Sequence, residues 1–298
     1  MTAMHGASES ALLSLWEGGQ TRHPIDRALL LCAWARPELA PEQLARLPLG
    51  TVNAALLQLR GALFGPTIDL QIACEQCGEQ LETQIITSDL LAGARTNDAP
   101  ATIDVQGFAF RLPDSRDLAA VSQEPDVDIA AQQLLERCCM SAPGRPKGEY
   151  RSAQHEGTPM STPGRPKGEY RSAQHEATPV STPGRPKGEY RSAQHEATPV
   201  SRPDGTADLR SLLAQVEEQL ESADPLADMR LDVTCHACGH HTAAVLDPCT
   251  VLWTDVQRHA RSLIEQVHTL ARAYGWTESE VLALSVARRS AYLELATD

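Results

Sequence analysis

Two short stretches decide the fold of this chain: Cys74-Glu75-Gln76-Cys77-Gly78 and Cys235-His236-Ala237-Cys238-Gly239. Two residues between a pair of thiolates allow one turn to present both sulfurs to a single ion, and the glycine that follows can adopt a positive φ. Two such pairs supply the four thiolates of a closed tetrahedral zinc site, which has no open coordination position for a substrate. Because residues 78–234 separate the pairs, this site would tie the two halves of the chain together.

Other interpretations of these cysteines remain open. A thioredoxin-type dithiol opens a helix after a strand, whereas both pairs here are followed by glycine and strand-like alternation, which favours metal binding over redox chemistry or unliganded thiols. The histidines at 236, 240 and 241 crowd the second pair and could replace one thiolate. Since four thiolates suffice, we predict a structural zinc with these ligands: Cys74, Cys77, Cys235 and Cys238. The other cysteines have no partner at ligand spacing, and Cys32 is expected to be a packed core thiol.

Both cysteine pairs are expected at the tips of β-hairpins. Apolar side chains alternate along 68–72 into the first pair and along 81–85 away from it. The same alternation leads into the second pair at 231–233 and away at 243–245. This pattern predicts a split zinc ribbon made of two hairpin knuckles.

Helical periodicity covers most of the remaining chain. It predicts a first helix capped by Ser8 or Ser10 that runs through Trp16, and further helices over these ranges: 24–35, 51–64, 115–121, 125–139, 209–220, 252–274, 277–284 and 285–295. A further tight hairpin is expected at 105–108. The predicted fold class is α+β, a helix-rich domain with a split zinc ribbon, interrupted by a disordered repeat insert. Residues 1–139 hold the first knuckle, 140–203 the insert and 204–298 the second knuckle, with 1–139 and 204–298 packed as one body.

The insert consists of three tandem copies of one unit, at 141–160, 161–180 and 181–200. Each copy has three prolines and little apolar surface, so it can neither sustain a helix nor stack into a solenoid, and we predict disorder. A recurring Gly-Arg-Pro-Lys is similar to the core of an AT-hook, which enters the DNA minor groove. The arginine that precedes the glycine in a full hook is replaced by proline in every copy: Pro143, Pro163 and Pro183.

The charge of the chain restricts its partners. The formal net charge is −13, although residues 141–200 carry nine basic against six acidic side chains. Such an acidic body repels phosphate backbones, which argues against nucleic-acid binding. Residues 1–19 lack the features of a signal peptide, and the longest apolar stretch, 28–35, is too short to span a bilayer. We therefore predict a soluble cytoplasmic protein with reduced thiols and no membrane partner.

No catalytic constellation stands out in the sequence. It contains no phosphate-cradling glycine loop, no nucleophile elbow and no His-Glu-x-x-His motif. His259 and His268 flank the apolar stripe of the long helix, and Arg288-Arg289 is expected on a solvated helix face. The sequence thus predicts neither an enzyme nor a small-molecule substrate.

Several stretches resemble a family of accessory proteins from tailed phages and contractile injection systems, linked to T-even-type baseplate hub assembly chaperones. The matching runs are Phe110-Arg111-Leu112-Pro113-Asp114-Ser115-Arg116-Asp117-Leu118, Asp224-Pro225-Leu226-Ala227-Asp228 and Val267-His268-Thr269-Leu270-Ala271-Arg272-Ala273-Tyr274-Gly275-Trp276. The resemblance implies a cytoplasmic, non-enzymatic factor whose protein partners belong to a baseplate or tail-like assembly. The repeat insert departs from the family pattern. The alternative is a zinc-ribbon nucleic-acid-binding regulator with AT-hook-like repeats.

Overall fold

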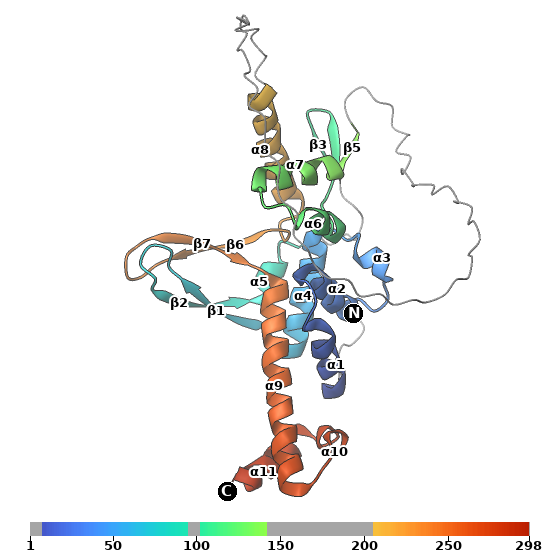
Figure 1. Ribbon diagram of the computed structural model, residues 1–298. Coiled ribbons are helices and arrows are strands. Elements are labelled where there is room, and N and C mark those ends of the chain that lie inside the picture. Colours follow the sequence, from blue (N-terminus) through green and yellow to red (C-terminus); the bar gives the residue numbers. More distant parts are fainter. Residues whose placement is uncertain (1–7, 95–101, 142–204, 298) are drawn as a thin grey trace, which may run out of the picture.

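The computed structural model describes residues 8–94, 102–141 and 205–297, whose arrangement is shown in Figure 1. These residues form an α+β fold of helices and small antiparallel sheets. Nearly all of the predicted insert, 140–203, lies outside the described residues. Its first two residues, Met140 and Ser141, belong instead to a short strand, so the predicted boundary at 139/140 falls inside an element of the fold.

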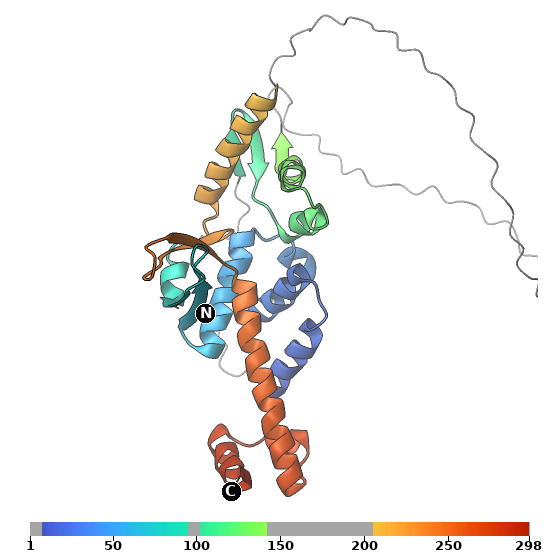
Figure 2. The ribbon, with the colours of Figure 1, turned by 60° about the vertical axis from the view of Figure 1, so that its left-hand side comes forward.

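The helical core packs the N-terminal helices against one long C-terminal helix. These elements are α1 (Glu9–Gly19), α2 (Pro24–Ala35), α4 (Leu49–Phe64) and α9 (Pro248–Tyr274). Figures 1 and 2 both show α9 running alongside α1 and α4 and continuing beyond them. Their shared core is mainly leucine, with Leu31, Leu56 and Leu252 fully buried. The apolar stripe predicted for the long helix is therefore the surface of α9 against which α1, α2 and α4 pack.

Close approach brings α1 onto α9. A Cβ added at Gly19 would lie 2.4 Å from the Trp253 ring, so only glycine fits at this contact. The Arg27 guanidinium lies over the same ring, 4.7 Å from its centroid. The Trp253 ring of α9 thus packs against both α1 and α2.

Buried polar contacts also join the two halves of the chain. Asp224 accepts a hydrogen bond from the Gly50 N–H at 2.9 Å, and the Asn53 amide donates to the Leu226 carbonyl at 2.8 Å. A Cβ at Gly50 would clash with the Asp224 carboxylate at 2.0 Å. The segment after residue 223 is therefore held on the first turns of α4, which places the strand that follows it.

Two hairpins extend from this helical core. The first pairs β1 (Thr67–Ala73) with β2 (Gln80–Ile86), and the second pairs β6 (Met229–Thr234) with β7 (His241–Leu246). Side chains at their bases share one apolar cluster with α4: Leu57, Ile68, Leu226, Met229 and Leu246. In Figure 1 the two hairpins project to the same side of α9 and lie next to each other. The predicted pair of hairpins is confirmed.

A second module stands at the opposite end of the molecule from the C-terminus (Figures 1 and 2). It contains β3 (Thr102–Val105), β4 (Phe108–Arg111), α6 (Ser115–Val121), α7 (Val127–Cys138), β5 (Cys139–Ser141) and α8 (Gly205–Ala223). The turn at Gln106 and Gly107 has positive φ at both positions, 54° and 82°, as a two-residue hairpin requires. The predicted tight hairpin is therefore confirmed.

The C-terminus folds back on the far end of α9. Gly275 ends that helix with a φ of 72°, and the chain continues through α10 (Glu278–Leu282) and α11 (Val286–Thr297). Arg289 is only 3% exposed and forms an ion pair with Glu9 of α1. The prediction of a solvated face is therefore wrong for this arginine, because pairing with an acidic residue at the other end of the sequence offsets its burial. No helix in the described ranges combines the length and hydropathy needed to cross a bilayer.

Other differences from the predicted elements are local. Three short elements carry too little periodicity to be predicted: α3 (Pro41–Leu44), α5 (Thr87–Leu91) and the strand β5. Helix α7 begins at Val127 rather than at 125, because the Asp126 carboxylate caps it by accepting bonds from the N–H groups of residues 128 and 129. Helix α4 begins two positions earlier than expected, after Pro48.

A buried carboxylate organises the second module. Asp117 is fully buried and accepts hydrogen bonds from Arg111 at 2.7 Å, from Arg137 at 3.1 Å and from the Asp114 N–H at 3.0 Å. Burial alone would raise the pKa of Asp117, but these donors outweigh it and hold the pKa at about 2. The carboxylate therefore links α6, β4 and α7 through charge-assisted bonds.

Replacing this carboxylate should destabilise the fold. We expect Asp117→Asn to lower the free energy of unfolding by about 3 kcal/mol. This value is at the low end of the range for breaking a buried ion pair, because the side chains of Arg111 and Arg137 are 29% and 43% exposed. Because the pKa of Asp117 is lower in the native state than its ordinary value of 3.8, the ionised carboxylate stabilises the fold fully at pH values above 3.8. This contribution is lost as the pH falls toward 2. The difference in the free energy of unfolding between the unmodified protein and Asp117→Asn should therefore narrow from pH 4 to pH 2. Urea unfolding followed by circular dichroism measures both effects.

The matched control is Asp232→Asn, which changes an exposed carboxylate on β6. It should alter stability by less than about 0.5 kcal/mol. Equal effects of the two substitutions would show that the Asp117 network does not organise the module.

Candidate metal centre

The turns at the two hairpin tips have the same backbone geometry. In the first, the Gly78 N–H donates to the Cys74 carbonyl at 2.8 Å, and the Cys74 N–H donates to the Glu79 carbonyl at 2.8 Å. The second repeats both bonds around Cys235 and Gly239, at 2.9 and 2.8 Å. Two sequence-distant segments thus fold into matching loops, each directing two sulfurs toward the other.

Glycine is needed after each cysteine pair because of backbone conformation rather than crowding. Gly78 and Gly239 have φ values of 74° and 73°, in the left-handed region that favours glycine. A Cβ added at either position would meet nothing within 4 Å. The loops therefore demand an unusual φ while remaining open on that side.

The four cysteine sulfurs form one cluster. All lie within 4.8 Å of one another, and the Cys74–Cys238 and Cys77–Cys235 Sγ–Sγ distances are both 3.7 Å. Four sulfurs placed about 2.3 Å from a central ion in a tetrahedron are about 3.8 Å apart, whereas a disulfide needs about 2.05 Å. The spacing thus fits a shared metal ion. The structure brings together all four cysteines that the sequence singled out.

Each hairpin contributes one buried and one exposed cysteine to the cluster. Cys74 and Cys235 are 2% and 1% exposed, while Cys77 and Cys238 face solvent. The buried pair packs with apolar side chains from both hairpins: Ile72, Leu81 and Val233. This arrangement shields one side of the cluster from water and leaves the other side at the surface, where an ion could enter.

The thiols have unequal acidities because they accept hydrogen bonds from different N–H groups and interact with one another. N–H groups of Cys77 and Gln76 donate to Cys74 and, against the effect of burial, lower its pKa to about 6. The N–H of Glu79 favours the ionised form of Cys77, but the neighbouring sulfurs, that of Cys238 above all, and partial desolvation outweigh it and raise the pKa of Cys77 to about 12. Four thiolates this close repel one another, and a bound cation removes that cost.

The neighbouring histidines make other contacts. His236 Nε2 lies 3.6 Å from the Glu79 carboxylate, and His241 Nδ1 lies 3.1 Å from the Thr234 hydroxyl. The carbonyl of His240 accepts the Cys235 N–H. Within the described ranges, the cluster able to hold an ion consists of the four cysteines alone.

One contact to the cluster was missed by sequence reasoning. The Thr242 hydroxyl is buried and lies 4.0 Å from Cys74 Sγ, across the boundary between the hairpins. Hydrogen bonds to ligating sulfurs tune a metal site. A threonine at an inward position of a strand carries no signal for this role, because the partner sulfur belongs to the other hairpin.

The remaining cysteines lie away from the cluster. Cys32, Cys138 and Cys249 are buried in the apolar interior, where burial raises their pKa values to about 11, 12 and 12. Such thiols are neutral at physiological pH and unreactive. The expectation that Cys32 is a packed core thiol is confirmed.

The chain was compared with protein-family models, curated protein sequences and solved structures, and none of the three comparisons found a match. The four-cysteine cluster therefore has to be interpreted from its own geometry. Its spacing and its mixture of buried and exposed sulfurs suit an ion held between two hairpins.

Metal binding should depend on the four clustered cysteines. Purified protein is expected to bind one divalent ion per chain, and Co²⁺ should give the thiolate charge-transfer and visible absorption bands of a tetrahedral sulfur site. Cys74→Ser should abolish both the bound ion and these bands, because three thiolates and a hydroxyl do not hold a soft site. Elemental analysis and absorption spectroscopy measure the two signals.

Cys139→Ser provides the control, since this cysteine lies in β5, outside the cluster. It should keep the full metal content. Retention of the ion in Cys74→Ser, or its absence from protein purified without chelators, would contradict the assignment.

Proposed function

We propose that this protein is a non-enzymatic, zinc-stabilised structural or assembly factor for the baseplate hub of a phage tail or contractile injection system. The observation that carries the structural part is the four-thiol cluster, in which hairpins from opposite halves of the chain each supply two ligands. Four thiolates occupy every position of a tetrahedral ion, so the ion would hold the two hairpins together without binding substrate.

Zinc is the ion that suits this ligand set best. Thiolates are soft ligands that select zinc over magnesium or calcium, and sets of four cysteines are typical of structural zinc in knuckles and ribbons. The positive-φ glycine after each pair and the N–H groups near the sulfurs favour such a knuckle.

The polar groups with strongly shifted pKa values in the described residues support a structural role. Asp117 is committed to two arginines, and Cys74 and Cys77 belong to the metal cluster. The buried thiol of Cys138 donates to the Asp117 carboxylate at 3.9 Å, and that of Cys249 donates to the Pro24 carbonyl at 3.8 Å. Each of these groups has a partner or environment that accounts for its shift without invoking a reaction.

The family resemblance supports the assignment to a baseplate. Its first stretch, 110–118, contains the Asp117 network, and its second, 224–228, contains the carboxylate that binds the Gly50 N–H. Its third, 267–276, includes Tyr274 and Trp276, whose rings stack at 4.8 Å. The resemblance thus falls on residues that build the fold, as expected if related proteins share this architecture.

The charges on the hairpins favour a protein partner over nucleic acid. Residues 67–86 and 229–246 carry a single arginine, Arg230, which pairs with Asp228 at 2.8 Å. Their acidic side chains outnumber it: Asp69, Glu75, Glu79, Glu82 and Asp232. A ribbon with this charge repels a phosphate backbone. The AT-hook-like repeats lie outside the described residues, so no structural observation favours the nucleic-acid alternative.

The proposal is tested in the organism that carries the gene. Deletion should leave tail-like particles without an assembled hub, and the wild-type gene should restore them. Cys139→Ser should restore them as well, whereas Cys235→Ser should fail, because it removes a metal ligand. Electron microscopy and mass spectrometry of purified particles provide the measurements. Normal particles in the deletion strain, or a gene neighbourhood without sheath, tube and baseplate proteins, would refute the role.

A further inference from the structure

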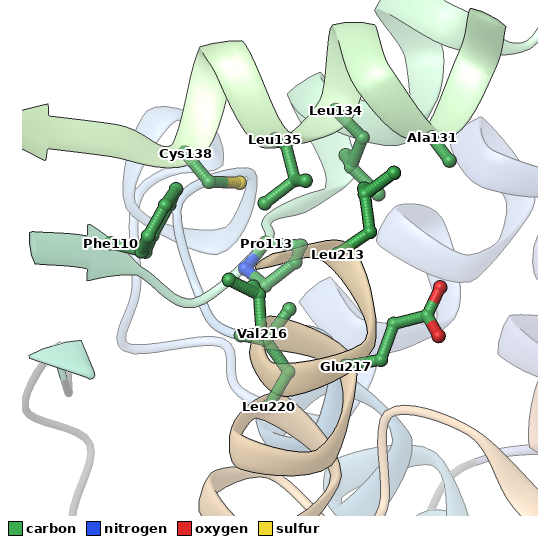
Figure 3. A pocket seen from close by; sticks show the side chains of 10 residues that line it. All are labelled: Phe110, Pro113, Ala131, Leu134, Leu135, Cys138, Leu213, Val216, Glu217 and Leu220. Atoms are coloured by element: carbon green, nitrogen blue, oxygen red, sulfur yellow. The ribbon is translucent and has the colours of Figure 1, made fainter. Parts of the chain in front are cut away.

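Helices α7 and α8 enclose an apolar groove that the proposed function does not use. Figure 3 shows Leu134 and Leu135 of α7 pointing toward Leu213 and Val216 of α8, with Phe110 closing one end. Phe110 and Val216 are buried, whereas the three leucines are only half-buried. The groove therefore has a buried apolar floor and apolar walls that are partly exposed to solvent.

The size of the groove sets what it can hold. Its volume is about 80 Å³, roughly half of the ~150 Å³ apolar cavity that accommodates benzene. Pockets for drug-sized ligands start at about 300 Å³. The groove thus has room for one aliphatic side chain rather than for an aromatic ring or a cofactor.

Apolar surface continues from the groove along α7. Val127 lies four residues before Ala131, a lining residue, and is therefore on the same face of the helix. Its side chain is 80% exposed, the highest value among the large hydrophobic residues in the described ranges. A segment anchored in the groove could cover this valine as well.

The rim of the groove is acidic. Glu217 lines the groove, and Figure 3 shows its carboxylate turned outward, away from the leucines. Glu221 follows one helical turn later on the same face of α8. Over α7 and α8 as a whole, six acidic residues outnumber two basic ones, Arg137 and Arg210, and Arg137 donates to the buried Asp117 at 3.1 Å. A basic segment would therefore meet complementary charge on this surface.

We propose that the α7–α8 groove binds a lysine- or arginine-rich segment of a partner protein, which inserts one aliphatic side chain between the two helices. The acidic rim repels phosphate groups and anionic lipid surfaces. It also opposes a second copy of the same acidic helices, because like charges would be brought together. The groove lies in a different module from the metal centre. Binding to it can therefore be tested separately from the proposed role in a tail particle.

The probe is a short fluorescein-labelled peptide with one central leucine and lysines on both sides, titrated into the metal-loaded full chain. Fluorescence anisotropy should show saturable binding. Replacing the leucine with serine should weaken binding at least about tenfold, because the buried anchor is lost. Replacing the lysines with glutamates should abolish it, because the rim then repels the peptide.

Matched substitutions locate the binding site. Ala131→Leu fills the groove and should weaken binding of the leucine peptide about tenfold, whereas Ala214→Leu adds the same volume at an exposed position of α8 and should not. Glu217→Lys should weaken binding more than Glu218→Lys, although both change the net charge equally. Circular dichroism and melting temperature verify the fold of each variant.

The contrary outcomes are distinct. Absence of binding would overturn the proposal, and binding that ignores both the central leucine and Ala131→Leu would assign the attraction to the general acidity of the chain. A change of oligomeric state in Ala131→Leu, measured by analytical ultracentrifugation, would instead place a second copy in the groove. If the peptide binds only after residues 142–204 are replaced by a short Gly-Ser linker, this chain's own segment is the occupant and the partner proposal is wrong.

Discussion

The rest of the structure depends on the packing of α4 against α9. Leu56 of α4 and Leu252 of α9 are fully buried in the same core, and Arg60 donates to Asp255 across the interface at 3.0 Å. Both helices adjoin a hairpin, since α4 runs into β1 and β7 runs into α9. The helix pair therefore sets where both hairpins begin, and their tips meet because their bases are held together.

In this arrangement, apolar burial and the metal centre stabilise different parts of the fold. Fully burying one leucine contributes about 1.5–3 kcal/mol, and the helical core buries many of them. Structural zinc contributes about 10–16 kcal/mol in isolated finger peptides, which have almost no core of their own. In this chain the core can bring the two halves together first, so the ion would mainly order the hairpins. A metal bound to the cysteine cluster would then stabilise an arrangement that the helical core already sets.

The elements that could be predicted are those whose signals are local. Helix α2 and helix α6 have the predicted bounds, because Pro24 and the Asp114 cap mark their starts within the sequence itself. The glycines after each cysteine pair mark the knuckles in the same way. The strand β5 and the ion pair of Arg289 with Glu9 could not be predicted, because their partners lie far away in the sequence. The Thr242 contact with Cys74 escaped for the same reason.

The sequence by itself determined most of the helices, the three tight hairpins and the identity of the four clustered cysteines, because φ preferences, caps and ligand spacing act over a few residues. Several helix ends, among them the starts of α4, α8 and α9, differ from the predicted positions by two to four residues. Only the tertiary structure decided that both cysteine pairs meet with sulfur spacings suited to one ion, and that α7 and α8 leave a groove with an acidic rim. These outcomes depend on how α4, α9 and the second module pack. Packing is a sum of many contacts between distant residues, and no local pattern encodes it.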